Sequence, residues 1–285
     1  SNLNLKSLDI LVIDNNFYLS AIRSKIDKEN IKCNKMIIYH SKINFEKFNF
    51  QQIYESKDCA PGAIGSGRMQ SFKLKNRDGL IFSSSELVSD VPNNLAQIDS
   101  SEFGKILFLD LKNFKIDIIS MGHRNVQGLK VYNNKIFATE HGPLGGDEFN
   151  KIIIGKNYGW PISSYGNSYI DKSRKYLKDH ETNDFIEPIF SFIPSPGVSE
   201  LIKLDFNFFK IKGLENIFLI TSLNGKSIYL IKLDNKYERV IFIEKIYIGQ
   251  RIRDITYINN INSILLALEK PSRLLLLKYI KKENH

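Results

Sequence analysis

A short stretch of this chain concentrates acidic side chains among glycines. Glu140, His141, Asp147 and Glu148 lie close together in the segment EHGPLGGDE. Glycines let the backbone turn so that main-chain carbonyls can face a cation, and calcium takes about six to eight oxygen ligands from carboxylates and carbonyls. The spacing is not that of an EF-hand. Two interpretations therefore stay open, a calcium site and an acidic turn at the surface.

The elements that must position this segment are predicted to be β-strands. Hydrophobic residues recur with a period of two along almost the whole chain. Asn-Asn, Asp-Gly and Asn-Gly pairs separate the runs and favour tight hairpins. Four-strand sets that recur every ~45 residues are typical of propeller blades. We expect an all-β fold, a β-propeller of about five visible blades forming a single domain over residues 1–285, with a generic β-sandwich as the alternative.

Three details of this architecture can be predicted as well. The last set of strands lacks one member, and we expect residues 2–7 to supply it or the blade to stay open. The segment 163–187 is polar and aperiodic, which predicts a long surface loop. No helix of three turns is expected.

Composition and charge exclude several classes of protein. Hydrophobic residues make up 42% and charged residues 25% of the chain, which excludes disorder as the main state. The longest apolar runs are short and bounded by charge, so no membrane span is expected. The net charge is +9, but the lysines are scattered and no nucleic-acid-binding motif is present, so we expect no nucleic-acid partner. Nothing indicates an oligomeric state.

A family resemblance rests on the stretch from Gly122 to Pro161, which reads GHRNVQGLKVYNNKIFATEHGPLGGDEFNKIIIGKNYGWP. It is similar to the soluble PQQ-dependent aldose sugar dehydrogenases, the glucose/sorbosone dehydrogenase family. Weaker similarities are SGRM at 66–69, AQ at 96–97, GKIL at 104–107 and RIRD at 251–254. The resemblance extends from about Asp9 to the end of the chain. It implies the six-bladed quinoprotein propeller, with the family's first blade expected to be missing before Leu8.

The resemblance also implies ligands for a metal and for a cofactor. Carbonyls at Gly142 and Pro143 match those that hold the calcium that polarises the quinone, and Asp147, Glu148 and Tyr158 match ligands of a second calcium. PQQ is an anionic tricarboxylate, and arginine binds carboxylates through two parallel hydrogen bonds. The positions that match the family's cofactor contacts are Arg124, Asn125, Arg251 and Arg253. The alternative for Arg251 and Arg253 is a salt-bridged pair at the start of a strand.

The sequence departs from the family where catalysis needs a base. Sugar oxidation requires a group that takes the hydroxyl proton, and an imidazole suits that task. The family's histidine position is Ile64 here, and no histidine lies between His40 and His123. An alkyl side chain cannot accept a proton, so we assign no catalytic residue. His123 is expected to be a hydrogen-bonded structural group.

These observations predict a calcium-binding, degenerate member of the family with weak or no PQQ-dependent sugar oxidation, and they leave PQQ binding itself open. One alternative is an active aldose dehydrogenase with a different base. The other is a structural propeller, or one that binds a sugar or another polar or anionic ligand without redox chemistry.

The two cysteines bear on the cellular compartment. Cys33 precedes one expected strand and Cys59 follows the next. If these strands are adjacent and antiparallel, they pair through positions whose numbers sum to about 92, and Cys33 would face Cys59 within disulfide range. Two separate thiols are the alternative. No initiator methionine or signal peptide is present in this chain, and the family's usual location favours a disulfide and a periplasmic or secreted protein.

Overall fold

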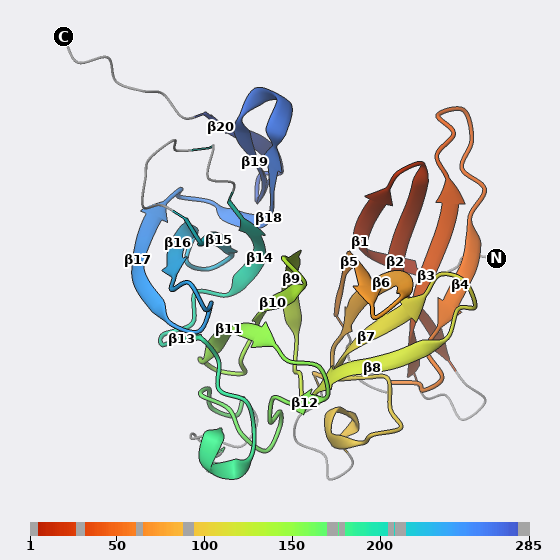
Figure 1. Ribbon diagram of the computed structural model, residues 1–285, viewed down its shortest axis with the longest axis horizontal. Helices are drawn as coiled ribbons and strands as arrows, with labels where there is room; N and C mark the ends of the chain where they lie inside the picture. Colours follow the sequence, from red (N-terminus) through yellow and green to blue (C-terminus); the bar gives the residue numbers. More distant parts are fainter. Residues whose placement is uncertain are drawn as a thin grey trace.

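A computed structural model describes residues 5–26, 32–60, 65–87, 94–169, 176, 180–204, 208 and 215–278. Five β-sheets follow one another in sequence order in this part of the chain (Figure 1). The fold is an all-β propeller of the expected class, with five blades visible. Its helices, within the same residues, are short 3-10 turns, and none of them could cross a membrane.

The strands within each blade are joined by hairpins. The first sheet contains β1 (Leu5–Ile13), β2 (Asn16–Ile26), β3 (Lys32–Lys42) and β4 (Gln51–Glu55). The second contains β5 (Ser66–Leu74), β6 (Arg77–Ser84), β7 (Lys105–Asp110), β8 (Ile116–Met121) and the added β12 (Lys156–Asn157). The third contains β9 (Val126–Tyr132), β10 (Lys135–Glu140), β11 (Asp147–Ile152) and β13 (Phe190–Phe192).

The last two sheets complete the described fold. The fourth contains β14 (Val198–Lys203), β15 (Ile217–Ser222), β16 (Ser227–Leu233) and β17 (Val240–Tyr247). The fifth contains β18 (Arg251–Ile258), β19 (Ser263–Glu269) and β20 (Arg273–Lys278). The short 3-10 helices are η1 (Leu95–Gln97), η2 (Glu181–Asn183) and η3 (Asn259–Ile261).

The predicted hairpins are confirmed, but two other details of the architecture differ from the expectation. Strand β12 was not expected; it pairs in parallel with β8, with Lys156 opposite Ser120. The prediction that residues 2–7 complete the last blade is wrong for Leu5–Ser7, because these residues begin β1 and pair with β2. The preceding residues lie outside the described part of the chain. The last sheet is therefore left with three strands among the described residues.

The period-two pattern of the sequence builds the core between neighbouring blades. Successive residues of a strand face opposite sides of its sheet. In β6, Leu80 and Phe82 pack against the first sheet, whereas Ile81 packs against the third. In β15, Leu219 faces the fifth sheet while Phe218 faces the third. Each inner sheet is thus apolar on both faces, because both faces are covered.

The first and fifth sheets each have one face without such cover. Ile10 and Val12 on β1 are 58% and 52% exposed, and Leu274 on β20 is 73% exposed. Within the described residues, no hydrophobic cluster joins these two sheets. The propeller core therefore runs from the first blade to the fifth without closing through apolar contacts.

The segment 163–187 forms little regular structure, as expected, but parts of it are buried. Ser163, Ser164 and His180 are all less than 5% exposed. Tyr176 packs on Trp160, with ring centroids 5.5 Å apart. The described parts of this segment therefore pack on the body of the propeller.

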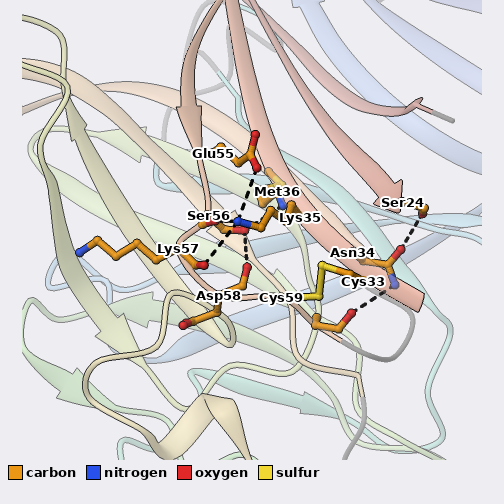
Figure 2. Close-up of a disulfide and its surroundings, with 11 residues drawn as sticks. Ser24, Cys33, Asn34, Lys35, Met36, Glu55, Ser56, Lys57, Asp58 and Cys59 are labelled. Carbon is orange, nitrogen blue, oxygen red and sulfur yellow. Dashed lines mark hydrogen bonds and ion pairs between the residues drawn. A yellow bond between two sulfur atoms is a disulfide. The ribbon is translucent and has the colours of Figure 1, made fainter. Parts of the chain in front are cut away.

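The predicted disulfide is present. Strands β3 and β4 are adjacent and antiparallel, with Ile38 opposite Tyr54. Cys33 and Cys59 are bonded, with Cα atoms 5.3 Å apart. Figure 2 shows the polar contacts that hold the two segments around the bond, among them Lys35 Nζ donating to the Ser56 carbonyl at 3.1 Å. The bond ties the start of β3 to the segment that follows β4.

The first strands of all five blades meet at a buried arginine. Arg68 on β5 contacts Asp9 on β1 at 3.3 Å, Glu200 on β14 at 3.1 Å and Asp254 on β18 at 2.8 Å. Its Nε donates to the carbonyl of Gln127 on β9 at 2.7 Å. We call this group the axial cluster. It holds the five inner strands together where the apolar core does not reach.

Candidate functional site

The predicted site residues come from loops at one end of the inner strands. Arg124 and Asn125 directly precede β9, and Arg251 begins β18. The glycine-rich loop follows β10, which is antiparallel to β9. Because the start of one strand and the end of its antiparallel neighbour lie at the same edge of a sheet, the topology brings these segments to one end of the propeller.

Glu140, at the end of β10, anchors the GHRN segment. One carboxylate oxygen accepts hydrogen bonds from the backbone N–H groups of Arg124 and Asn125. The other lies 2.9 Å from His123 Nδ1, and His123 Nε2 lies 2.8 Å from Ser120 Oγ. His123 is fully buried and both its ring nitrogens are occupied, which agrees with the structural role expected for it.

Arg124 is held against the glycine-rich loop. Its Nη1 donates to the carbonyls of His141 at 3.1 Å and Gly142 at 2.8 Å. Its guanidinium lies over Trp160, 5.3 Å from the ring centroid. The Nε is buried without a hydrogen-bond partner, and burial lowers the pKa of Arg124. A buried donor without a partner is costly, so this edge of the guanidinium is suited to an anionic ligand.

The glycine-rich loop is tightly folded. A Cβ on Gly142 would lie 2.1 Å from the Gly145 carbonyl oxygen, so the position has room only for glycine. Gly145 and Gly146 have φ of +95° and +66°, which confirms that glycine is needed for the turn. Pro143 is buried, and its ring packs over Gly166. The carbonyls of this loop are therefore held in fixed positions.

Asp147 holds the glycine-rich loop in place through hydrogen bonds. Its carboxylate oxygens accept from the backbone N–H of Gly142 at 3.2 Å and of Val198 at 2.8 Å. Its own N–H donates to Ser195 Oγ at 2.8 Å. Asp147 thereby ties the loop after β10 to the start of β14. This is a structural role, whether or not a metal also binds there.

Glu148 and Tyr158 border a small cavity. Its volume is about 10 Å³, and its lining includes Glu140, Ser163 and Ser164, so it has room for about one water-sized sphere. Glu148 lies opposite Glu140 in the ladder. Burial, and then the neighbouring charge of Glu140, raise the pKa of Glu148. A cation in the cavity would favour the ionised form of Glu148 and so oppose both effects.

The ligands that a metal would find here are mostly carbonyls and hydroxyls. No group of three or more His, Cys, Asp or Glu side chains is placed to hold a metal in the described part of the chain. The Tyr158 hydroxyl donates to the Lys151 carbonyl at 2.6 Å and accepts from Ile153 N–H at 2.9 Å. The Tyr158 hydroxyl is therefore already paired with the main chain, and the carboxylates of Glu140 and Glu148 are the acidic groups of the cavity lining. Carboxylate oxygens are ligands that calcium takes.

Arg251 and Arg253 share a carboxylate. Arg251 Nε lies 3.1 Å and Arg253 Nε 2.6 Å from the two oxygens of Glu269 on β19. Burial raises the pKa of Glu269, but the hydrogen bonds from both arginines outweigh it, so the pKa is lowered overall. Both arginines thus form salt bridges, their contact with a cofactor stays a prediction, and Glu269, which sequence reasoning missed, partly neutralises the pair.

A chain of hydrogen bonds links these arginines to the GHRN segment. Arg253 Nη1 donates to Gln127 Oε1 at 3.4 Å, and Gln127 Nε2 donates to Asn125 Oδ1 at 2.8 Å. Arg251 Nη1 donates instead to Asn224 Oδ1 at 2.6 Å. The structure thus connects Arg253 with Asn125 and turns Arg251 toward the fourth blade. Gln127 was missed because a polar residue inside a strand carries no distinctive signal.

His141 lies in the acidic segment that the sequence analysis described, but no role was predicted for it. Its Nε2 donates to the Val198 carbonyl, which leaves Nδ1 as the acceptor, 3.5 Å from Asn125 Nδ2. Burial lowers the pKa of His141. The ring is therefore neutral, with a lone pair directed toward Asn125. Ile64 lies outside the described residues, but the next residue, Gly65, lies beside Asn125 at this same end.

Comparison with known proteins identifies the family. The model of the family described as Glucose / Sorbosone dehydrogenase matches residues 15–276. The chain belongs to this family. The aldose sugar dehydrogenase YliI of Escherichia coli is 31% identical over 152 residues, which is 52% of this chain and 40% of that protein. The chain spans less than half the length of the curated relatives it matches, 44% and 40%.

Solved structures support the fold. The apo soluble aldose sugar dehydrogenase from Escherichia coli matches with a TM-score of 0.75 and 21% identity, covering 95% of this chain and 82% of that one. The PQQ-bound aldose sugar dehydrogenase from Streptomyces coelicolor matches with a TM-score of 0.65 and 16% identity, covering 95% and 93%. Five blades of this glucose/sorbosone dehydrogenase-family chain thus superpose on a six-bladed relative.

Proposed function

We propose that this glucose/sorbosone dehydrogenase-family propeller binds calcium at the glycine-rich loop and has weak or no PQQ-dependent sugar oxidation. The observation that carries the first part is the cavity beside Glu148, which has room for one ion and whose lining contains two carboxylates, Glu140 and Glu148, against one guanidinium, that of Arg124. The second part rests on Ile64, because it replaces the group that would accept the sugar's proton.

The residues present fit PQQ only in part. Arg124 offers a buried Nε without a partner, and Asn125 lies beside it. When bound, PQQ supplies a quinone that accepts the hydride from the sugar. Arg251 and Arg253 would contribute less charge than two free arginines, because Glu269 pairs with both. We therefore expect any PQQ binding to be weak.

The central experiment is to load the purified protein with calcium and PQQ and to follow reduction of a redox dye with aldoses. We expect little or no turnover, with the Escherichia coli relative as positive control. The Ile64→His variant should gain activity, since a general base typically contributes ~10²–10⁴-fold. Robust glucose oxidation by the unaltered chain would contradict the proposal.

His141 favours one alternative, an active dehydrogenase with a different base. Its Nδ1 carries a lone pair at the same end of the propeller as Arg124. If the loaded protein oxidises aldoses, His141→Gln should abolish turnover while leaving PQQ binding, measured by equilibrium dialysis, unchanged. If turnover survives this substitution, His141 is not the base.

A purely structural propeller is the other alternative. Calcium-dependent thermal stability with no response to PQQ, in binding or in melting temperature, would favour it.

We also propose a periplasmic or secreted location, on the strength of the Cys33–Cys59 bond. Disulfides persist in oxidising compartments and are rare in the cytosol. Thiol labelling of the denatured, unreduced native protein should find no free thiol. Two labelled cysteines would remove this argument for export.

A further inference from the structure

A larger pocket lies at the opposite end of the inner strands from the GHRN segment. Its volume is about 500 Å³, and it lies between the ends of β9, β14 and β18. That volume is within the range of small-molecule sites, about 300–1,000 Å³. The apolar part of its wall comes from Tyr132, Ile202, Leu204 and Tyr257.

The pocket contains an ammonium group without a counter-ion. Lys130 lines it and is only partly exposed. Among the described residues, the Lys130 ammonium has neither a hydrogen bond nor an ion pair. The acid that acts on it through its charge is Glu200, which contacts Arg68 at 3.1 Å and accepts from Leu129 N–H at 3.2 Å. Glu200 therefore belongs to the axial cluster and forms no ion pair with Lys130.

A second lysine adds to the positive charge of the lining. Lys203 Nζ lies over the Tyr132 ring, 4.8 Å from its centroid, and donates to the Leu204 carbonyl at 2.9 Å. Glu215 is the carboxylate that the lining contains, and it is exposed. The lining thus combines two ammonium groups with aromatic and aliphatic walls.

In other pockets of similar volume, the lysines are either paired with a carboxylate or exposed. In three of them, at about 490–530 Å³, the lining residues Lys57, Lys73 and Lys151 are each paired with a carboxylate. Lys115, which also lines one of them, is exposed. Lys130 is therefore unusual in being sheltered, adjacent to a pocket and unpaired.

We propose that this pocket binds a small organic anion, with a carboxylate or phosphate group against Lys130 and an apolar or aromatic body between Tyr132 and Tyr257. A partly buried charge is costly unless it is paired, and an anionic ligand provides the missing partner. The apolar walls would cover the rest of the ligand. This site is independent of the calcium and PQQ proposals, because it uses none of their residues.

Phenyl phosphate and benzoate are suitable probes, with benzyl alcohol as the neutral control, and binding can be measured by titration calorimetry. We expect an anionic probe to bind at a site that depends on Lys130, and we expect no detectable binding of benzyl alcohol. Lys130→Met should weaken binding by at least ~10-fold, because hydrogen bonds to a charged group contribute about 1.5–3 kcal/mol. Lys130→Arg should retain most of the affinity.

Two matched variants locate the site. Lys112→Met removes an exposed lysine from the turn after β7, and Lys115→Met removes another exposed lysine. Both should leave binding unchanged. As a measurement on the unaltered protein, phenyl phosphate should protect Lys130 from acetylation by acetic anhydride, read by mass spectrometry. Equal binding by the Lys130→Met protein, an equal loss of binding in the two control variants, or no protection of Lys130 would overturn the proposal.

Discussion

A buried arginine, Arg68, and a partly buried one, Arg124, both lie in segments that resemble the family, but their partners are arranged in opposite ways. At Arg68 every guanidinium nitrogen has a partner, and three carboxylates surround the group. At Arg124 only backbone carbonyls accept from Nη1, and Nε has no partner. The first arrangement is complete within the protein. The second is incomplete, as expected for a group that awaits a ligand.

This contrast shows that resemblance to a family does not separate structural from ligand-binding positions. Arg68 lies in the SGRM segment, and Asp254 lies in the RIRD segment next to Arg253, which was expected to contact a cofactor. Their contact at 2.8 Å joins β5 to β18. The partners of a side chain, more than its place in a motif, distinguish the two roles.

The largest expected effect is that of Arg68→Met. Removing the guanidinium leaves Asp9, Glu200 and Asp254 facing one another without a cation, and breaking a buried ion pair in this way costs about 3–5 kcal/mol. Urea unfolding should show this loss. Lys73→Met is the control: its ion pair with Asp78, at 3.6 Å, is exposed on both sides and should contribute less than about 1 kcal/mol. Similar losses in the two variants would contradict the structural role of the axial cluster.

Glu200 should make the axial cluster sensitive to pH. Burial, against the opposing effect of Arg68, raises the pKa of Glu200 from 4.5 to about 8. Between these values the unfolded chain has released the proton and the folded protein retains it. Stability should therefore fall as pH rises through this window, by up to about 1.4 kcal/mol per pH unit.

The groups that face Glu200 are Arg68, Asp9, Asp254 and Lys130. Burial also raises the pKa of Asp9, so Asp9 acts in the same direction. Melting temperatures at pH 5 and pH 8 test the prediction. Glu200→Gln, which cannot ionise, should flatten the profile. An unchanged profile in this variant would assign the pH dependence to other groups.

Substitutions of Asp147 and Glu148 should distinguish the residue that holds the glycine-rich loop from the residue that binds a metal. Asp147→Asn replaces one of the two accepting oxygens by an NH₂ group, so one backbone N–H loses its acceptor, which should cost about 1–3 kcal/mol with or without calcium. Glu148→Gln should reduce only the stabilisation that calcium adds. Thermal melts in calcium and in chelator measure both. If the Glu148→Gln protein gains as much from calcium as the unaltered protein, the small cavity is not the metal site.

The smallest effect on stability is expected for Arg124→Met. The variant loses two hydrogen bonds to carbonyls but also removes the buried Nε that has no partner, so the net cost should be about 1 kcal/mol. The same unfolding assay allows direct comparison with Arg68→Met. A loss as large as that of Arg68→Met would mean that Arg124 is as structural as the arginine at the axis.

Local features of the fold could be predicted from the sequence, and features that depend on distant contacts could not. Alternating hydrophobic residues and turn pairs located the hairpins, and the Cys33–Cys59 pairing followed from the register of two adjacent strands. The axial cluster was not predictable, because its members lie on different blades and a charged residue in a strand gives no indication of its partner. Gln127 and Glu269 were missed for the same reason. Strand β12 was missed because two residues carry no periodicity.

The axial cluster also bears on how the chain folds. Each sheet is built mainly from consecutive strands, so most pairings close short loops, whereas Arg68 and Asp254 are 186 residues apart. Short loops close at low entropic cost, and long-range contacts form after them. The ion pairs at the axis should therefore form after the blades, and their loss should accelerate unfolding while leaving the folding rate nearly unchanged. The central arginine thus governs the lifetime of the folded propeller and has little effect on the speed of its formation.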